Sequence, residues 1–168
     1  MGKDKLKTFF LAISLFGSPY FYIPATAYFI QVNTHLAINL ILVLIATELI
    51  CAIIKYIYPK QRPMPMPNKT FIQKYFAGSF PSVHTARIAA FSIAIFPFYA
   101  NKIFVLIALL IIIGVGYSRV YLKKHYLVDV LAGFVIGAVI STSVLVMQNA
   151  FFFNLRLQTQ YIYAKLFK

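Results

Sequence analysis

Two residues of complementary chemistry, His125 and Asp129, stand four positions apart where an apolar segment begins. On a helix this spacing places both side chains on one face. A carboxylate that accepts a hydrogen bond from one imidazole nitrogen fixes the tautomer, so that the other nitrogen can attack an electrophile. The pair therefore indicates a histidine nucleophile with an orienting carboxylate, although a structural hydrogen bond is the commoner role of such a pair taken alone.

A second histidine, His84, follows Pro81 and Ser82 at the start of another apolar segment. Serine is favoured at the position before a helix, and the free N–H groups of a helix start bind anions. We expect the Ser82 hydroxyl and the free backbone N–H groups of the helix start to hold a phosphate, while His84 gives a proton to the departing oxygen. The alternative is a capping serine beside an incidental histidine.

Three basic residues could neutralise the oxygens of a phosphoryl group in the transition state, namely Lys55, Arg62 and Arg119. Lys55 alone would be explained by its place near the end of an apolar segment, where lysine extends its amine to water. Glu48 lies seven residues before Lys55, and a carboxylate at that depth needs a partner, so we expect it to form hydrogen bonds within the protein. Arg87 contacts either substrate or lipid headgroups.

These residues need a membrane scaffold. Of the 168 residues, 61% are hydrophobic and 11% charged, and five stretches approach the 20 or so apolar residues that span a bilayer. The stretches are residues 8–31, 36–58, 82–100, 102–118 and 126–148. We predict an all-α, polytopic transmembrane helix bundle of five spans, with six as the alternative, that forms one domain over residues 1–168. Five spans bring every residue discussed above to one membrane face.

The segments outside these spans are short. The connection of residues 59–81 contains four prolines, and within it Phe71 to Phe76 predicts a short interfacial helix. Residues 149–168 mix aromatic and basic side chains and predict an interfacial C-terminal tail. Gly133 and Gly137 stand four apart, a spacing that lets two membrane helices approach closely. Cys51 is the one cysteine, so no disulfide can form within the chain.

The polar residues follow an ordered pattern. Lys55 is separated by six residues from Arg62-Pro63, Pro81-Ser82-Val83-His84 follows, and Ser118-Arg119 is separated by five residues from His125 and then by three from Asp129. The chain resembles the type-2 phosphatidic acid phosphatase superfamily, in which all three spacings recur. It departs from the family pattern at Val83, where glycine is usual, and a side chain there narrows the approach of a phosphate to the backbone.

The resemblance implies a phosphohistidine mechanism without metal ion or cofactor. In it His125 attacks phosphorus, Asp129 orients His125, and His84 protonates the leaving group. Lys55, Arg62, Ser82, Val83 and Arg119 hold the phosphoryl group, and water then releases phosphate. The rival interpretations are transfer of the phosphoryl group to a second lipid, and a non-catalytic membrane protein that uses the cluster to bind headgroups.

The formal charge of +13 indicates which partners to expect. Basic residues beside a bilayer attract anionic headgroups and phosphates, so we expect a membrane lipid phosphate rather than nucleic acid, and no obligatory protein partner. By resemblance in size and basicity, lipid A 1-phosphate is the first candidate substrate. Phosphatidylglycerol phosphate, undecaprenyl diphosphate and phosphatidic acid are the alternatives.

The side of the membrane is less simply predicted. On the face with the candidate site lie 12 of the 16 basic residues, and 4 lie on the other, which by the positive-inside rule places the site in the cytoplasm. The resemblance instead implies a bacterial inner membrane with the site facing the periplasm. We favour the periplasmic site, because cations needed for catalysis distort the count.

Overall fold

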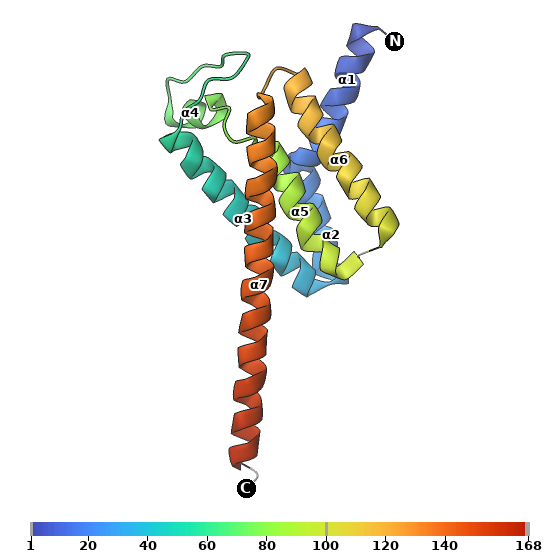
Figure 1. The fold of residues 1–168 in the computed structure, drawn as a ribbon, viewed down its shortest axis with the longest axis vertical. Coiled ribbons are helices and arrows are strands. Elements are labelled where there is room, and N and C mark those ends of the chain that lie inside the picture. Colours follow the sequence, from blue (N-terminus) through green and yellow to red (C-terminus); the bar gives the residue numbers. More distant parts are fainter. Residues whose placement is uncertain (1, 100, 167–168) are drawn as a thin grey trace.

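The computed structural model describes residues 2–99 and 101–166, and its description of side chains covers residues 2, 4–99 and 101–150. Within this part the regular secondary structure is all helical, with no strand, which confirms the predicted all-α class. Figure 1 shows the helices as one bundle. They are α1 (Lys3–Ser14), the 3-10 turn η1 (Leu15–Gly17), α2 (Pro19–Val32), α3 (Thr34–Ile57), α4 (Phe71–Ala77), α5 (Val83–Tyr99), α6 (Lys102–Tyr121) and α7 (Leu127–Leu166).

The five predicted spans fall on these helices, but among the described residues only three, or four with one bent pair, are long and apolar enough to cross a bilayer. Helices α3 and α6 and the Leu127–Ala150 part of α7 are each long and apolar enough to cross a bilayer. The α1 and α2 segments meet this test together as a pair bent by 44°, and α5 is a shorter apolar helix. The bend lies at Pro19, which has no N–H to lose at the first turn of α2. The chain is a multi-pass membrane protein.

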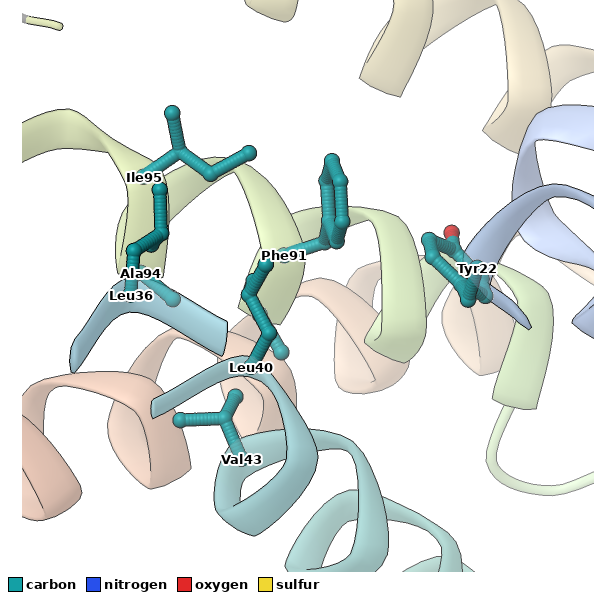
Figure 2. Close-up of a cluster of buried hydrophobic side chains, with 8 residues drawn as sticks. Tyr22, Leu36, Leu40, Val43, Phe91, Ala94 and Ile95 are labelled. Atoms are coloured by element: carbon teal, nitrogen blue, oxygen red, sulfur yellow. The ribbon is translucent and has the colours of Figure 1, made fainter. Parts of the chain in front are cut away.

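Helix α5 lies at the centre of the bundle, and most of its residues from Val83 to Ile95 are buried. One apolar cluster joins it to α2 and α3, and Figure 2 shows Phe91 of α5 near Leu40 of α3 and Tyr22 of α2. On another side α7 packs along α5 at Gly133 and Gly137. A Cβ atom at Gly133 would meet the carbonyl oxygen of Ser82, and one at Gly137 that of Ala86. The predicted close approach of two helices is thus confirmed.

The connection between α3 and α5 contains the predicted short helix, α4. It begins with a capping box, in which the Thr70 hydroxyl accepts from the Gln73 N–H and the Gln73 side chain accepts from the Thr70 N–H. Phe71 and Ile72 are strongly exposed, as an interfacial helix requires. Helix α7 continues to Leu166 and extends past the other helices in Figure 1. The interfacial tail predicted at residues 149–168 falls mostly on side chains outside the described part and stays a prediction.

The contact between α5 and α7 yields a prediction about stability. Leucine in place of Gly137 would drive its side chain into the backbone of α5, and overpacking of this kind costs about 1–3 kcal/mol. We expect Gly137→Leu to lower the thermal unfolding temperature in detergent by several degrees. Val139→Leu is the matched control, because Val139 on the same helix is exposed. Equal unfolding temperatures for the two variants would contradict the close packing.

Candidate active site

One cavity of about 320 Å³ collects residues from both ends of the family pattern. Its walls come from the start of α2, the end of α3, the α3–α5 connection, the start of α5, the end of α6 and the loop before α7. The last five of these segments lie at the α4 end of the bundle in Figure 1. Six of the eight predicted site residues line it: Lys55, Arg62, Val83, His84, Arg119 and His125. Segments far apart in the sequence therefore meet on one face, as expected.

His125 is held by a backbone carbonyl. Its ring is buried, and Nδ1 lies 2.6 Å from the carbonyl oxygen of Ser79. A carbonyl oxygen only accepts hydrogen bonds, so Nδ1 carries the proton and Nε2 keeps a free electron pair. The sequence predicted that Asp129 would accept this hydrogen bond, but its nearest carboxylate oxygen is 3.9 Å from Nδ1. The direct partner that fixes the tautomer is thus Ser79, a residue the sequence analysis missed.

The surroundings of His125 also control its protonation. Burial lowers the pKa of His125 well below its usual value, and the positive charges of Arg62, Arg119 and Lys55 lower it further. Both effects have the same physical basis, because an imidazolium ion would lose its hydration and face like charges. The ring therefore stays neutral around pH 7, which is the form that can act as a nucleophile.

Asp129 connects the site to two other segments. One carboxylate oxygen accepts from the Lys60 amine at 2.6 Å, and the other accepts from the Tyr126 N–H at 2.9 Å. Its backbone carbonyl oxygen accepts from the Ser82 N–H at 2.9 Å. The buried carboxylate is thus fully partnered, and its negative charge lies close enough to His125 to stabilise positive charge on the ring. The sequence analysis missed Lys60, whose position two residues before Arg62 fits no pattern.

Two of the basic residues converge on a single carbonyl group. The Lys55 amine donates to the carbonyl oxygen of Gly78, and the Arg62 Nη2 donates to the same oxygen at 3.4 Å. On the opposite side Arg119 donates from Nη1 to the hydroxyl of Ser14, at the end of α1, at 2.6 Å. This contribution of α1 could not be predicted from the spacing of the polar residues.

The guanidinium groups of Arg62 and Arg119 each keep an unused donor. Within the described part of the chain, the Nε of each is buried without a hydrogen-bond partner. A buried donor left unpaired costs free energy, and natural proteins rarely tolerate one without a purpose. Arginine Nε and Nη groups form a planar fork that suits phosphate oxygens. Two such forks with unpaired donors, lining one cavity, favour an anion between them.

The start of α5 places the remaining predicted residues differently. His84 lines the cavity, and η1 packs closely behind it, since a Cβ at Gly17 would lie 2.7 Å from the His84 Cβ. Ser82 precedes the first residue of α5, as predicted, but its buried hydroxyl lies 3.0 Å from that of Thr85 and is absent from the cavity wall. Val83 does line the cavity. The hydroxyl expected to hold phosphate is therefore paired with a neighbour.

Glu48 and Arg87 form an ion pair in the cavity wall. Arg87 donates to one Glu48 carboxylate oxygen from both Nε, at 2.9 Å, and Nη2. The hydroxyl of Tyr75, on α4, donates to the other oxygen. Glu48 thus forms the hydrogen bonds within the bundle that the sequence suggested, and it connects α3, α4 and α5 at the site.

The cavity therefore combines a neutral imidazole, a second histidine and four basic side chains, one of them paired with Glu48, around a space suited to a phosphoryl group. No cluster of three or more histidine, cysteine or acidic side chains fit to hold a metal ion occurs among the described residues. Metal independence rests on the family pattern and stays a prediction.

We compared the sequence and the fold with those of known proteins. A model of the PAP2 superfamily matches residues 36–153. The undecaprenyl-diphosphatase of Sulfolobus acidocaldarius is 26% identical over 133 residues, which are 77% of this chain and 64% of that protein. The chain thus spans less than two thirds of that relative's length.

Two crystal structures share the fold. LpxE of Aquifex aeolicus has a TM-score of 0.73 at 22% sequence identity, and the match covers 86% of this chain and 87% of that one. A transmembrane PAP2-type phosphatidylglycerolphosphate phosphatase from Bacillus subtilis has a TM-score of 0.71 at 25% identity, over 89% of this chain and 80% of that one. The matched residues run from α3 into α7 and include every predicted site residue, so the chain belongs to the PAP2 superfamily of type-2 phosphatidic acid phosphatases.

Proposed function

We propose that the protein is a metal-independent lipid phosphatase in which His125 forms a phosphohistidine intermediate. The observation that carries the proposal is the hydrogen bond from His125 Nδ1 to the Ser79 carbonyl oxygen. It leaves Nε2 unprotonated beside a cavity whose arginines have unpaired donors. A nucleophile and an anion site in one small space are the minimum that phosphoryl transfer requires.

The reaction has two steps. In the first, the electron pair of His125 Nε2 forms a bond to phosphorus while the bond from phosphorus to the lipid oxygen breaks. The electron pair of that bond stays on the lipid oxygen, which takes a proton from the imidazolium form of His84 and leaves as the alcohol. In the second, water attacks phosphorus, the N–P bond breaks, and the proton of the water passes to His84. Inorganic phosphate is the second product.

Lys55, Arg62 and Arg119 stabilise the oxygens of the transferred group in both steps. Lys55 and Arg62 reach it by leaving the Gly78 carbonyl oxygen, to which both now donate. The backbone N–H of Val83 adds a donor at the first turn of α5, where helix geometry favours anions. The Ser82 hydroxyl pairs with the Thr85 hydroxyl within this turn, so we assign Ser82 a positioning role.

Asp129 and Lys60 act through His125. Attack on phosphorus places positive charge on the imidazole, and the nearby carboxylate stabilises that charge. Lys60 holds the carboxylate from the side away from the ring and compensates for its burial. Lys60 is therefore a positioning residue, since it touches neither the nucleophile nor the phosphate.

A second cavity favours hydrolysis over transfer to another lipid. Its volume is about 590 Å³, its wall is formed mainly by the connection of residues 58–78, and it shares Lys55 and Arg62 with the active-site cavity. Its wall includes Lys60, Gln61 and Asn68, which are polar groups that hold water. We infer that water enters and phosphate leaves by this route. A phosphotransferase would instead need room for a second lipid here, and labelled donor lipid distinguishes the two, because transfer moves the label to another lipid.

For the substrate we propose lipid A 1-phosphate first, followed by phosphatidylglycerol phosphate, undecaprenyl diphosphate and phosphatidic acid.

We place the enzyme in a bacterial inner membrane with the site facing the periplasm. An impermeant thiol reagent would test the orientation in a Cys51→Ala, Lys69→Cys variant. The proposed reaction needs no obligatory protein partner.

The identity of the nucleophile is tested by phosphate release from these four lipids. We expect the intact protein to release phosphate from at least one of them, and vanadate to inhibit the release because it mimics the transferred group. His125→Ala should reduce release by at least about a thousandfold, since the variant lacks the proposed nucleophile. A His125→Ala variant that remains folded and keeps more than a tenth of the activity would refute the role.

The role of Lys60 is tested separately. Lys60→Met leaves the buried Asp129 carboxylate without its ion-pair partner. Because the Lys60 side chain is 25% exposed, water replaces part of the interaction, and we expect a loss of about tenfold in kcat with little change in KM. Lys69→Met, in the same connection, is the control for loss of one positive charge. A tenfold rise in KM with unchanged kcat would instead indicate that Lys60 binds the phosphate.

A further inference from the structure

The Glu48–Arg87 ion pair lies where two cavities meet. Besides lining the active-site cavity, both residues line an apolar cavity of about 630 Å³ between α2 and α3. The wall of this apolar cavity is formed by side chains such as Ile23, Ala27 and Ile45. The two cavities share Pro19, Glu48 and Arg87, so a lipid chain attached to a phosphate in the active site reaches this apolar surface beside the pair. The pair therefore lies on the leaving-group side of the reacting phosphorus.

Charge is distributed unequally on the two sides of that phosphorus. Lys55, Arg62 and Arg119 have no direct carboxylate partner among the described contacts and donate to neutral oxygens. Arg87 in contrast donates from two nitrogens to Glu48, and its Nη1 lies 3.4 Å from the Gly17 carbonyl oxygen. The positive charge of Arg87 is thus matched by a carboxylate. The side of the cavity with Lys55, Arg62 and Arg119 is therefore cationic. The side with Glu48 and Arg87, along which the lipid chain would lie, is neutral overall.

We propose that the Glu48–Arg87 pair determines specificity, by favouring lipids with a single phosphate over lipids with a diphosphate. This inference rests on the proposed function and narrows its substrate class to phosphate monoesters. In a monoester the breaking bond joins phosphorus to the oxygen of an alcohol, and that oxygen is a neutral hydroxyl once it has taken a proton from His84. Neutral polar groups of the lipid can then hydrogen-bond to the pair.

A diphosphate lipid meets a different environment. There the bond from the terminal phosphorus to the bridging oxygen breaks, and the electron pair stays on a second phosphate that is already anionic. That phosphate would lie beside the Glu48 carboxylate, and like charges at short distance are disfavoured in a partly buried site. Arg87 offsets this repulsion only in part, because it shares its charge with Glu48, to which its Nε and Nη2 donate. The leaving group would thus be charged on the side where the protein is not cationic.

Two lipids with identical acyl chains test the inference, phosphatidic acid and diacylglycerol pyrophosphate. Phosphate release from each is measured with the full chain in detergent micelles, and the ratio of the two kcat/KM values is compared among variants. We expect the unmodified protein to favour phosphatidic acid by about tenfold or more. Glu48→Gln keeps the shape of the side chain and its bond to Tyr75 but frees the charge of Arg87, so the ratio should shift towards the diphosphate by about tenfold.

The opposite substitution should have the opposite effect. Arg87→Gln leaves the Glu48 carboxylate without compensation, so the ratio should shift further towards phosphatidic acid. Asp4→Asn is the matched control, because it removes one carboxylate from exposed sequence on α1 and should leave the ratio unchanged. A purely structural role for the pair would lower both activities together, and that result would overturn the inference.

Three further outcomes are decisive. Preference of the unmodified protein for the diphosphate, or a shift of both variants in the same direction, would overturn the inference while leaving the phosphatase function intact. If Glu48→Gln fails to fold, Arg87→Gln alone still tests the inference through the direction of its shift. Absence of phosphate release from every lipid phosphate tested would refute the proposed function itself.

Discussion

The hydrogen bond from His125 Nδ1 to the Ser79 carbonyl oxygen is the interaction on which the site depends. It joins the loop before α7 to the residues that precede α5, and it sets which ring nitrogen is free. The close contact of α5 and α7 makes this possible, because Gly133 and Gly137 let the two helix backbones approach. The Ser82 N–H bond to the Asp129 carbonyl oxygen adds a second connection between the same segments. Helix packing and tautomer selection are therefore parts of one arrangement.

Concentrating positive charge beside a bilayer has a cost that the protein offsets in two ways. Lys55, Arg62 and Arg119 are stabilised by donating to neutral oxygens, which leaves them able to bind an anion. Arg87 is instead neutralised by Glu48. The first arrangement suits a group whose charge changes during reaction, and the second suits the passage of a neutral part of the substrate. This division follows from where the few carboxylates of the chain are placed.

The sequence predicted the helical class, the short helix of the α3–α5 connection and the convergence of separate segments, because apolar runs and polar spacing carry that information. It could not predict the Ser79 carbonyl as the partner of His125, since every residue has a carbonyl group and only tertiary structure selects one. Lys60 and Ser14 were missed for a related reason, as their contacts cross 69 and 105 positions of chain. The assignment of the Ser82 hydroxyl to phosphate took no account of Thr85. In the structure the Thr85 hydroxyl pairs with that of Ser82 and competes with this role.

The central claim is that His125 Nε2 bonds to phosphorus inside this cavity. A crystal structure of the protein with bound vanadate tests it most directly. The account predicts trigonal-bipyramidal vanadium bonded to His125 Nε2, with Arg62 and Arg119 on its equatorial oxygens and the His125 Nδ1 bond to Ser79 retained. Vanadate bound elsewhere, or held in the cavity with the His125 ring turned away from vanadium, would contradict it.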